Sequence, residues 1–573
     1  MVNLKIDGKS VAVPEGSTIL EAARQAGVNI PTLCYLKDVN EISACRVCCV
    51  EVAGSEKLVP SCSTPAVEGM EVFTHTTRVL QARVTNVSLI LSQHNSTCTA
   101  CTRSGNCALQ SLASDITYTP AYEVFPRKMD WDTHYPLIRD NSRCINCMRC
   151  VSVCEKIQTM RVWDVSGTGA RTHVGVREGL DLMDTNCTLC GQCITHCPVG
   201  ALYSRDDAVK LVRRLGNRHD KVFICQVAPA VRTAWGEDLG LSPEQATVGR
   251  MAAALRAIGF DYVFDTDFSA DLTIMEEGSE FLERLSHKED YPWPMFTSCC
   301  PGWLRFIKTE FPELVPNLST AKSPQQMFGA TAKSYFAEKI GRDPEDIVCV
   351  SFMPCTAKKY ECAVEAVNDA ATRDVDMVLT TRELAKMLRN FRINVAELPE
   401  EDFDDPLGES TGAGVIFGTT GGVMEAALRS AYYLATGSNP DPDAFHAVRG
   451  MEGIKAATFD IEGTKVRTAV ANGLGNARKL VEAIKAGKAE YDFVEIMACP
   501  TGCSGGGGQP IRDGQELGER RGSILRRLDV EKPIRFSHDN PSIQKLYSEY
   551  LEKPLSHRAH KLLHTDVSQW SLK

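Results

Sequence analysis

The segment "FVEIMACPTGCSGGGGQP" (493–510) joins an apolar run to two cysteines and a run of four glycines. Two other apolar runs, in "YPWPMFTSCC" (291–300) and "EDIVCVSFMPC" (345–355), also end in cysteine. Short apolar runs bounded by proline or glycine, with helical segments between them, are typical of buried strands in α/β units. Ligands of open α/β sheets bind beyond the carboxyl ends of the strands. The sequence therefore predicts an α/β domain in which cysteines from three distant segments converge on one site.

Further strands are predicted in "KVFICQVAP" (221–229) and "GAGVIFGTTGG" (412–422). Periodicity alone does not distinguish such short apolar runs from buried turns of helix, so the helical alternative stays open. The basic stretch "KLVRRLGNRHDK" (210–221) is interpreted as a solvated linker. The glycine run 505–508 is expected to let the backbone approach a cofactor closely, because glycine has no Cβ.

Composition narrows the class of protein. The chain has 573 residues, a net charge of −10 and 24 cysteines. Its negative charge argues against sequence-independent nucleic-acid binding. It has no run of about 18 apolar residues, and its alternating start is unlike a signal peptide, so we expect a cytoplasmic protein without a membrane partner. Because disulfide frameworks belong to small secreted chains, the cysteines are interpreted as metal ligands.

Residues 1–78 are predicted to form a small β-rich domain. They begin with an alternating hairpin, and a helix follows that starts at a capping box, Thr18 with Glu21, and ends near Gly27. Four cysteines that could bind a [2Fe–2S] cluster come next: Cys34, Cys45, Cys48 and Cys62. Cys49 is an alternative to Cys48, but the spacing of two residues from Cys45 favours Cys48. The segment resembles the β-grasp ferredoxin domain at the front of complex-I-type subunits.

Residues 79–126 contain the stretch "HNSTCTACTRSGNC" (94–107). His94 precedes three cysteines that lack a fourth partner: Cys98, Cys101 and Cys107. A zinc ion bound by three cysteines and one histidine is chemically possible. A [4Fe–4S] cluster with one histidine ligand is favoured, because the rest of the chain indicates electron transfer.

Residues 127–209 contain the same cysteine spacing twice, in "CINCMRCVSVC" and "CTLCGQCITHCP". In bacterial ferredoxins with two [4Fe–4S] clusters, the fourth cysteine of each such run binds the other cluster. One cluster is therefore assigned Cys144, Cys147, Cys150 and Cys197, and the other Cys187, Cys190, Cys193 and Cys154. Together with the preceding segments, this gives one [2Fe–2S] and three accessory [4Fe–4S] clusters.

Three segments of the remaining residues, 210–573, resemble the signature segments of the [FeFe]-hydrogenases: "TSCCPGW" (297–303), "MPCTAKKYE" (353–361) and "EIMACPTGCSGGGGQP" (495–510). With the cluster order upstream, the whole chain is similar to the long monomeric clostridial type. The resemblance implies a multidomain α+β and α/β protein with a large α/β H-cluster domain. It also implies an H-cluster, which is a [4Fe–4S] cube joined to a two-iron unit with CO, cyanide and dithiolate amine ligands. Its cube would be held by Cys300, Cys355, Cys499 and Cys503, with Cys503 bridging to the two-iron unit.

The resemblance assigns further residues to the cofactor by motif position: Lys358, Met353, Met497, Gln325, Ala228 and Pro229. Ala230 stands where many relatives have serine, so one cofactor hydrogen bond is expected to be missing. The resemblance also implies a proton relay from solvent to the cofactor through Arg284, Glu280, Ser319, Glu277 and Cys299. Without it, Glu277, Glu280 and Arg284 would be interpreted as an exposed ion-pair face of a helix.

The expected function is reversible reduction of protons to H2, with electrons from reduced ferredoxin or a similar small carrier. Hydrogenase maturation enzymes are expected partners, and the chain is expected to be a monomer. Two alternatives stay open: a subunit of a larger respiratory or bifurcating complex, and a hydrogenase-like iron–sulfur assembly factor. The intact "TSCCPGW" and the full set of accessory cysteines argue against the assembly factor.

Overall fold

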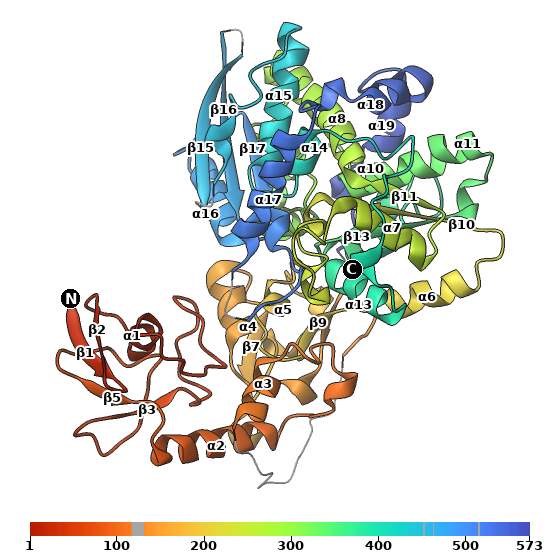
Figure 1. The fold of residues 1–573 in the computed structure, drawn as a ribbon. Helices are drawn as coiled ribbons and strands as arrows, with labels where there is room; N and C mark the ends of the chain where they lie inside the picture. Colours follow the sequence, from red (N-terminus) through yellow and green to blue (C-terminus); the bar gives the residue numbers. More distant parts are fainter. Residues whose placement is uncertain (117–130, 451–452, 462, 514–515, 573) are drawn as a thin grey trace.

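The computed structural model describes residues 1–116, 131–450, 453–461, 463–513 and 516–572. A small N-terminal domain projects from a larger body, and the segment with α2 (Thr77–Leu91) connects the two (Figure 1). The predicted boundary between residues 126 and 127 lies outside the described residues. No helix of the described chain is long and apolar enough to cross a membrane.

The N-terminal domain has a five-stranded sheet in the order β2-β1-β5-β3-β4. Its elements are β1 (Val2–Ile6), β2 (Lys9–Val13), α1 (Ile19–Gln25), β3 (Cys49–Val52), β4 (Val59–Pro60) and β5 (Glu71–Phe73). Asp7 and Gly8 both have positive φ, as a tight hairpin turn between β1 and β2 requires. The Thr18–Glu21 capping box is formed at the start of α1. The predicted hairpin and helix are therefore confirmed.

The next segment consists of short elements around the cysteine runs. Its helices are α2 (Thr77–Leu91), α3 (Ala108–Asp115), α4 (Arg149–Ser152) and α5 (Gln192–Thr195). Its strands form two antiparallel pairs, β6 (Leu137–Arg139) with β9 (Leu202–Ser204), and β7 (Trp163–Ser166) with β8 (His173–Val176). The pairing of β6 with β9 brings the two cysteine runs together, because each run adjoins one of these strands.

The large domain contains two four-stranded sheets in its described part. The first is wholly parallel and has the order β11 (Tyr262–Asp265), β10 (Val222–Val227), β13 (Ile347–Met353) and β14 (Met377–Thr380). The second has the order β12 (Met295–Phe296), β17 (Phe493–Met497), β16 (Thr464–Asn472) and β15 (Ile454–Ile461), with only β15 antiparallel to its neighbour. Cys225 and Cys349 are fully buried in β10 and β13, as expected of small apolar side chains.

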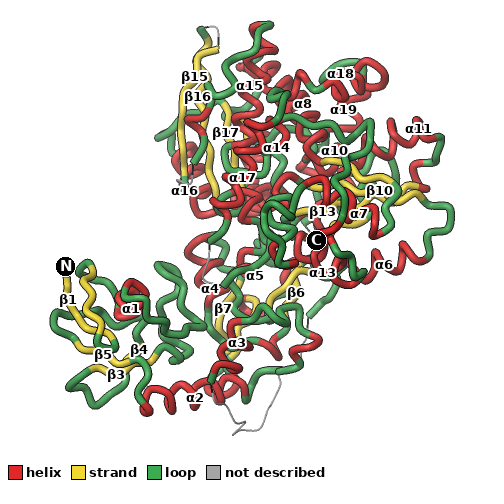
Figure 2. Tube along the Cα trace, viewed as in Figure 1, coloured by secondary structure: helices red, strands yellow, loops and turns green. Residues whose placement is uncertain are grey.

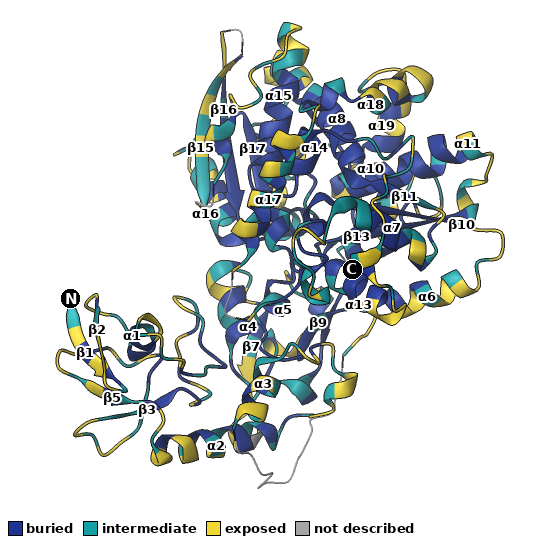
Figure 3. Ribbon diagram, viewed as in Figure 1, coloured by how far each residue is buried: buried dark blue, intermediate teal, exposed yellow. Residues whose placement is uncertain are grey.

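Helices cover both sheets, as the ribbon and the tube show (Figures 1 and 2). They are α6 (Ala208–Gly216), α7 (Val248–Ile258), α8 (Thr266–Ser286), α9 (Pro301–Glu310), α10 (Pro324–Thr331), α11 (Ala337–Ile340), α12 (Lys358–Glu361), α13 (Thr381–Asn390), α14 (Gly412–Ile416), α15 (Gly422–Thr436), α16 (Leu474–Lys485), α17 (Gly518–Glu531), α18 (Pro541–Leu546) and α19 (His557–Leu563). The long helix α8 packs against α10, α14 and α15 and is buried along most of its length (Figure 3). A buried helix can hold carboxyl groups away from water.

Two expectations about this domain are wrong. The predicted strand within 412–422 is the helix α14 instead, packed so closely on α8 that a Cβ at Gly414 would overlap the Asp267 backbone. The predicted linker 210–221 is largely the helix α6, in which Leu211 is fully buried while Arg213 and Arg214 are exposed. Both segments are short, and tertiary packing decided between structures that their patterns allowed.

Candidate active site

Five cysteines meet where three strands end. Cys299 and Cys300 follow β12, Cys355 follows β13, and Cys499 and Cys503 follow β17. The Ala498 amide donates to the Cys300 sulfur at 3.5 Å, which ties the end of β12 to the end of β17. The predicted convergence at the carboxyl ends of strands is therefore confirmed.

Four of these cysteines form one group, in which Cys499 is buried and the other three are partly buried. Burial raises the pKa of Cys355 to about 12, and the neighbouring Cys300 adds to this. Burial likewise raises the pKa of Cys499, and Cys355, Cys300 and Cys503 increase it further. Four such thiolates would repel one another in a dry pocket, unless bound metal compensates their charge. The donor set, which comprises Cys300, Cys355, Cys499 and Cys503, fits an iron–sulfur cube.

The glycine run 505–508 packs against protein backbone. A Cβ on Gly507 would overlap the Cys190 carbonyl, and one on Gly506 or Gly508 would overlap the backbone of Pro354. Arg382 fixes the same loop by donating to the Gly507 carbonyl at 2.7 Å. The glycines therefore let three backbone segments meet beside the site, which is a different reason from the expected approach to a cofactor.

One set of accessory cysteines adjoins the site directly. The Gln158 side-chain amide donates to the Cys190 sulfur at 3.4 Å and to the Ala498 carbonyl at 2.9 Å. The Cys499 sulfur lies 3.8 Å from the Cys190 carbonyl oxygen. A cluster held at Cys190 would therefore lie next to one held at Cys499.

The two ferredoxin-like runs line two separate cavities. One cavity is lined by Cys144, Cys147, Cys150 and Cys197, together with Arg139. The other is lined by Cys154, Cys187, Cys190 and Cys193, together with Gln158. These are the two sets expected when each run contributes its fourth cysteine to the other group. We call the first set the junction group and the second the inner group.

The junction group connects to both upstream cysteine sets. Asn40 donates to the carbonyls of Cys34 at 2.7 Å and Cys147 at 2.9 Å. The Arg103 side chain donates to the Cys197 carbonyl at 2.9 Å, and its backbone amide donates to the Cys101 sulfur at 3.5 Å. Electrons arriving from either upstream set would therefore reach the junction group.

The N-terminal cysteines form one cluster of thiols. Hydrogen bonding to Cys62 lowers the pKa of Cys48, and Cys34 interacts with both Cys45 and Cys62. For Cys49, in contrast, burial is the main influence and raises the pKa. The structure thus places Cys48, and not Cys49, with the other three.

His94 is buried, and its Nδ1 has no hydrogen-bond partner among the described residues. Burial lowers its pKa, which favours the neutral ring that a metal ligand requires. Cys107 lies near Cys101 in the same loop. Across the described chain, no three His, Cys, Asp or Glu side chains close around a single ion. The four ligands of a [4Fe–4S] cluster need not surround one ion, because each of them binds a different iron atom.

A chain of polar groups leads from the surface toward Cys299. Arg284 and Ser319 both donate to the Glu280 carboxylate, at 2.5 and 2.7 Å. Glu277 lies one helical turn before Glu280, is fully buried, and has no hydrogen-bond partner for either oxygen in the described structure. Burial and the neighbouring Glu280 raise the pKa of Glu277 to about 8. Arg284, Glu280 and Ser319 are therefore joined by hydrogen bonds, and Glu277 is buried beside them, where the pattern alone suggested an exposed helix face.

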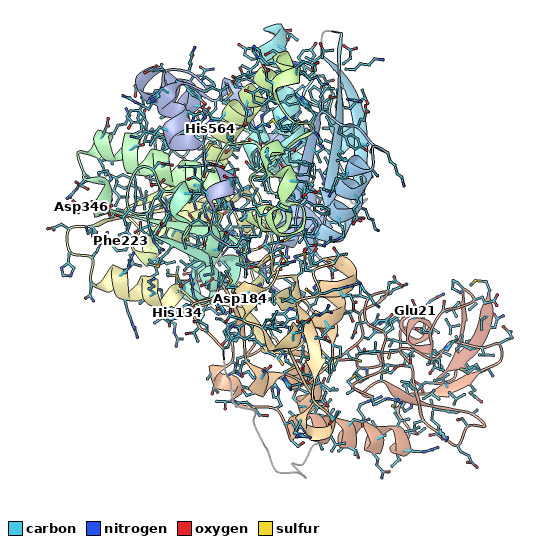
Figure 4. The ribbon with its side chains drawn as sticks, turned by 180° about the vertical axis from the view of Figure 1, so that it is seen from behind. Glu21, His134, Asp184, Phe223, Asp346 and His564 are labelled. Carbon is cyan, nitrogen blue, oxygen red and sulfur yellow. The ribbon has the colours of Figure 1, made fainter. Side chains whose placement is uncertain are left out.

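Cys299 completes this chain at the inner end. It is buried, and burial together with the charge of Glu277 raises the pKa of its thiol. At the outer end, Arg284, Ser319, Thr320 and His564 line a surface cavity of about 430 Å³. Figure 4 shows His564 in the large domain, far from the N-terminal domain that contains Glu21. Water in the cavity can therefore reach Arg284 and Ser319, which both donate to Glu280, while Glu277 and Cys299 do not line the cavity and are buried.

Glu361 is a site residue that the sequence did not reveal. It is fully buried and accepts from Lys358 at 2.8 Å, Gln325 at 3.1 Å and Ser323 at 3.0 Å. Lys358 also donates to the Cys299 carbonyl at 3.1 Å. Glu361 thus holds Lys358 and Gln325 beside Cys299, and its sequence signals were its place at the end of the segment 353–361 and the three-residue spacing from Lys358 on α12.

The remaining predicted residues are apolar and lie at strand ends. Ala228 and Pro229 follow β10, while Met353 and Met497 end β13 and β17. All four are buried. Ala230 packs near Val415 and Leu525, with Cys503 at the edge of this cluster. These side chains make the surroundings of the cysteines apolar.

Replacing Glu277 by glutamine should make the protein less sensitive to alkaline pH. The folded pKa of about 8 lies above the ordinary value of 4.5, so the proton on Glu277 stabilises the fold at low pH. This stabilisation is lost as pH rises from about 4.5 through about 8, on a scale of about 5 kcal/mol. We expect the melting temperature of Glu277→Gln to fall less between about pH 6 and pH 9 than that of the wild type. The exposed Glu283→Gln serves as control, and equal falls for all three proteins would contradict the raised pKa.

Family models match nearly all of the chain. Residues 221–507 match "Iron only hydrogenase large subunit, C-terminal domain", and residues 515–568 match "Iron hydrogenase small subunit". Upstream, residues 1–77 match a 2Fe-2S iron-sulfur cluster binding domain, residues 83–119 the NADH-ubiquinone oxidoreductase-G iron-sulfur binding region, and residues 143–201 a 4Fe-4S dicluster domain.

Two relatives match almost the whole chain in sequence, and a solved structure matches part of it. The chain is 50% identical to the NADP-reducing hydrogenase subunit HndD of Solidesulfovibrio fructosivorans, over 99% of this chain and 98% of the relative. It is 38% identical to iron hydrogenase 1 of Clostridium pasteurianum, over 98% and 99%. A solved structure of apo [FeFe]-hydrogenase HydA1 from Chlamydomonas reinhardtii has 47% identity and a TM-score of 0.56, covering 62% of this chain and 98% of that one.

Proposed function

This chain belongs to the iron-only hydrogenase family, and on that basis we propose that it interconverts protons and H2 using electrons from reduced ferredoxin or a similar small carrier. Family membership makes it a hydrogenase with 2Fe-2S and 4Fe-4S domains and an H-cluster domain. The resemblance inferred from its three cysteine-containing segments is thereby confirmed.

The observation that best supports the proposal is the position of Cys499 between two sets of thiols. It belongs to the four cysteines at the strand ends, and it also lies against the Cys190 carbonyl of the inner group. A redox site in that position has a short connection to an electron-transfer chain. Its polar link through Gln158 is buried and fixed at both ends.

We assign the metal groups to the cysteine sets that the fold brings together. The N-terminal set would hold one [2Fe–2S] cluster, and the His94 set, the junction group and the inner group would each hold a [4Fe–4S] cluster. The cube of the H-cluster would be held by Cys300, Cys355, Cys499 and Cys503, with Cys503 also bridging to the two-iron unit. When bound, the H-cluster supplies the redox-active centre at which electrons and protons combine. Lys358 and Gln325 would orient it through the donors that Glu361 positions.

Proton movement is assigned to Arg284, Glu280, Ser319, Glu277 and Cys299. A group that titrates near pH 8 can both accept and donate a proton under neutral conditions, as Glu277 must in a reversible reaction. The Ser319 hydroxyl can pass a proton on, because it can donate and accept at the same time. The dry pocket around Cys299 keeps water from bypassing this order.

A second candidate is that the chain acts as one subunit of an NADP-reducing assembly. The supporting observation is the 50% identity, over almost the full length, to a protein named as a subunit of such a hydrogenase. The junction group suits either case, because it connects two upstream cysteine sets. In both cases we place the protein in the cytoplasm, and in the first it works as a monomer.

One preparation tests these proposals. The protein is matured anaerobically with the hydrogenase maturation enzymes, and its infrared bands in the CO and cyanide region are recorded together with H2 evolution. Absence of both after verified maturation would exclude the catalytic assignment. H2 evolution with reduced ferredoxin by the purified chain alone supports the monomer. Activity with a nicotinamide only in a larger co-purified complex would support the second candidate.

A further inference from the structure

A buried arginine lies among the cysteines of the junction group. Arg139 is at the end of β6 and is only 2% exposed. Its Nη2 donates to the Cys144 sulfur at 3.3 Å, and its Nε donates to Asn141 at 2.7 Å. Its guanidinium also lies 5.2 Å from the ring centroid of Trp163. The charge is therefore held in one position against a cluster ligand.

Arg139 faces most of the junction group and not Cys144 alone. It lines the same cavity as Cys144, Cys147, Cys150 and Cys197, and it interacts electrostatically with three of these thiols. No carboxylate among the described residues makes an ion pair with it. Its positive charge is therefore directed at whatever this cavity binds.

The inner group has a different environment. The side chain that donates to one of its sulfurs is the neutral amide of Gln158, at 3.4 Å from Cys190. Arg305 is also nearby, but its Nε donates to the Cys187 carbonyl at 2.8 Å and not to a sulfur. Two groups with the same cysteine spacing thus differ in the charge of the donor at the sulfur.

We propose that Arg139 is a positioning residue that raises the reduction potential of the junction cluster, so that electrons from both upstream branches collect there first. Reducing an iron–sulfur cluster adds one negative charge, and a fixed positive charge nearby stabilises the reduced form. The low exposure of Arg139 strengthens this effect, because little water screens it. Hydrogen bonds to the ligating sulfur act in the same direction.

The position of the junction group gives this potential a role. It contacts the Cys34 set through Asn40 and the Cys101 set through Arg103, while the inner group alone adjoins the active site. A junction cluster that is easier to reduce would hold an electron until the inner cluster has passed its own electron to the active site. This inference rests on the proposed assignment of clusters to these cysteines.

The test uses the purified full-length protein with all its clusters, titrated with reductant and followed by electron paramagnetic resonance. Arg139→Met removes charge and donors, Arg139→Gln keeps donors, and Arg139→Lys keeps the charge. For Arg139→Met we expect the midpoint potential of one accessory cluster to fall by about 59 mV, which is about a tenfold change in its one-electron reduction equilibrium. The midpoint potentials of the other accessory clusters should stay unchanged. Arg139→Lys should retain more of the wild-type potential than Arg139→Gln if charge dominates. Arg171→Met removes an exposed charge from the same domain and should leave every midpoint unchanged.

Unchanged midpoints in Arg139→Met would overturn the proposal, and so would equal shifts of all accessory clusters. If Arg139→Met loses its junction cluster, as shown by lower iron content, the lysine and glutamine variants decide in its place. Their midpoints must then lie below the wild-type value for the proposal to stand. A wild-type protein with no reducible accessory signals would instead contradict the proposed function, which distinguishes the two failures.

Discussion

Replacing Cys299 by serine should remove most H2 turnover while leaving the infrared signature of the H-cluster in place. The Cys299 thiol is buried between Glu277 and the four-cysteine group. Lys358 donates to the backbone carbonyl of Cys299. A serine hydroxyl occupies nearly the same space but gives up its proton far less readily. General acid and base groups contribute about 10²- to 10⁴-fold to rate, so turnover should fall by about a hundredfold or more.

The control for Cys299 is Cys362→Ser. Cys362 is also buried in the large domain, and its thiol donates only to the Lys359 carbonyl, at 3.4 Å. Both variants lose one buried thiol, so any general cost of that change appears in both. The rates of H2 evolution and of H2 oxidation are both measured, on proteins with equal iron content and infrared intensity. Near-normal rates in Cys299→Ser would remove this thiol from the proton route.

Replacing Cys300 by serine should prevent stable assembly of the H-cluster. Cys300 is the residue next to Cys299, but its sulfur accepts from the Ala498 amide and influences Cys355, Cys499 and Cys503. Adjacent side chains in an extended segment point to opposite faces, so the two cysteines serve different neighbours. Loss of one thiolate leaves three for the cube, and we expect the iron of the cube and of the attached two-iron unit to be lost, about six atoms per chain.

Iron and sulfide analysis and infrared spectroscopy check this result. In Cys300→Ser the CO and cyanide bands should be absent or strongly reduced, while the signals of the accessory clusters remain. Cys299→Ser is the matched control, because it changes the neighbouring residue in the same way and should keep the bands. An intact infrared spectrum in Cys300→Ser would contradict its assignment as a ligand.

Much of the site could be predicted because its signals are local or topological. The spacing of "CINCMRCVSVC" and "CTLCGQCITHCP" already implied an exchange of Cys154 and Cys197, and the structure places both in the exchanged sets. The apolar runs before Cys300, Cys355 and Cys499 predicted strand ends, because ligands of α/β sheets gather there. These predictions needed only local spacing and one rule of sheet topology.

Residues whose surroundings come from distant segments could not be predicted in this way. Arg139 and Glu361 are ordinary charged residues in the sequence, and only folding brings them next to Cys197 and Gln325. The exposed-face interpretation of Glu277 and Glu280 was set aside only by resemblance, since a helix pattern does not reveal that α8 is buried along most of its length. Gly507 likewise has its close neighbour, Cys190, in another domain.

Because the catalytic site takes its cysteines from three strand ends, the cluster sites of this chain are completed in a fixed order during synthesis. Each accessory set draws its ligands from neighbouring stretches of the first part of the chain, whereas the four-cysteine group needs both Cys300 and Cys503. Synthesis proceeds from the N-terminus, and contacts between distant segments form late. The ligands of the accessory clusters are therefore complete while the ribosome is still adding the catalytic domain. The catalytic pocket is the last cluster site of the newborn chain that can receive metal.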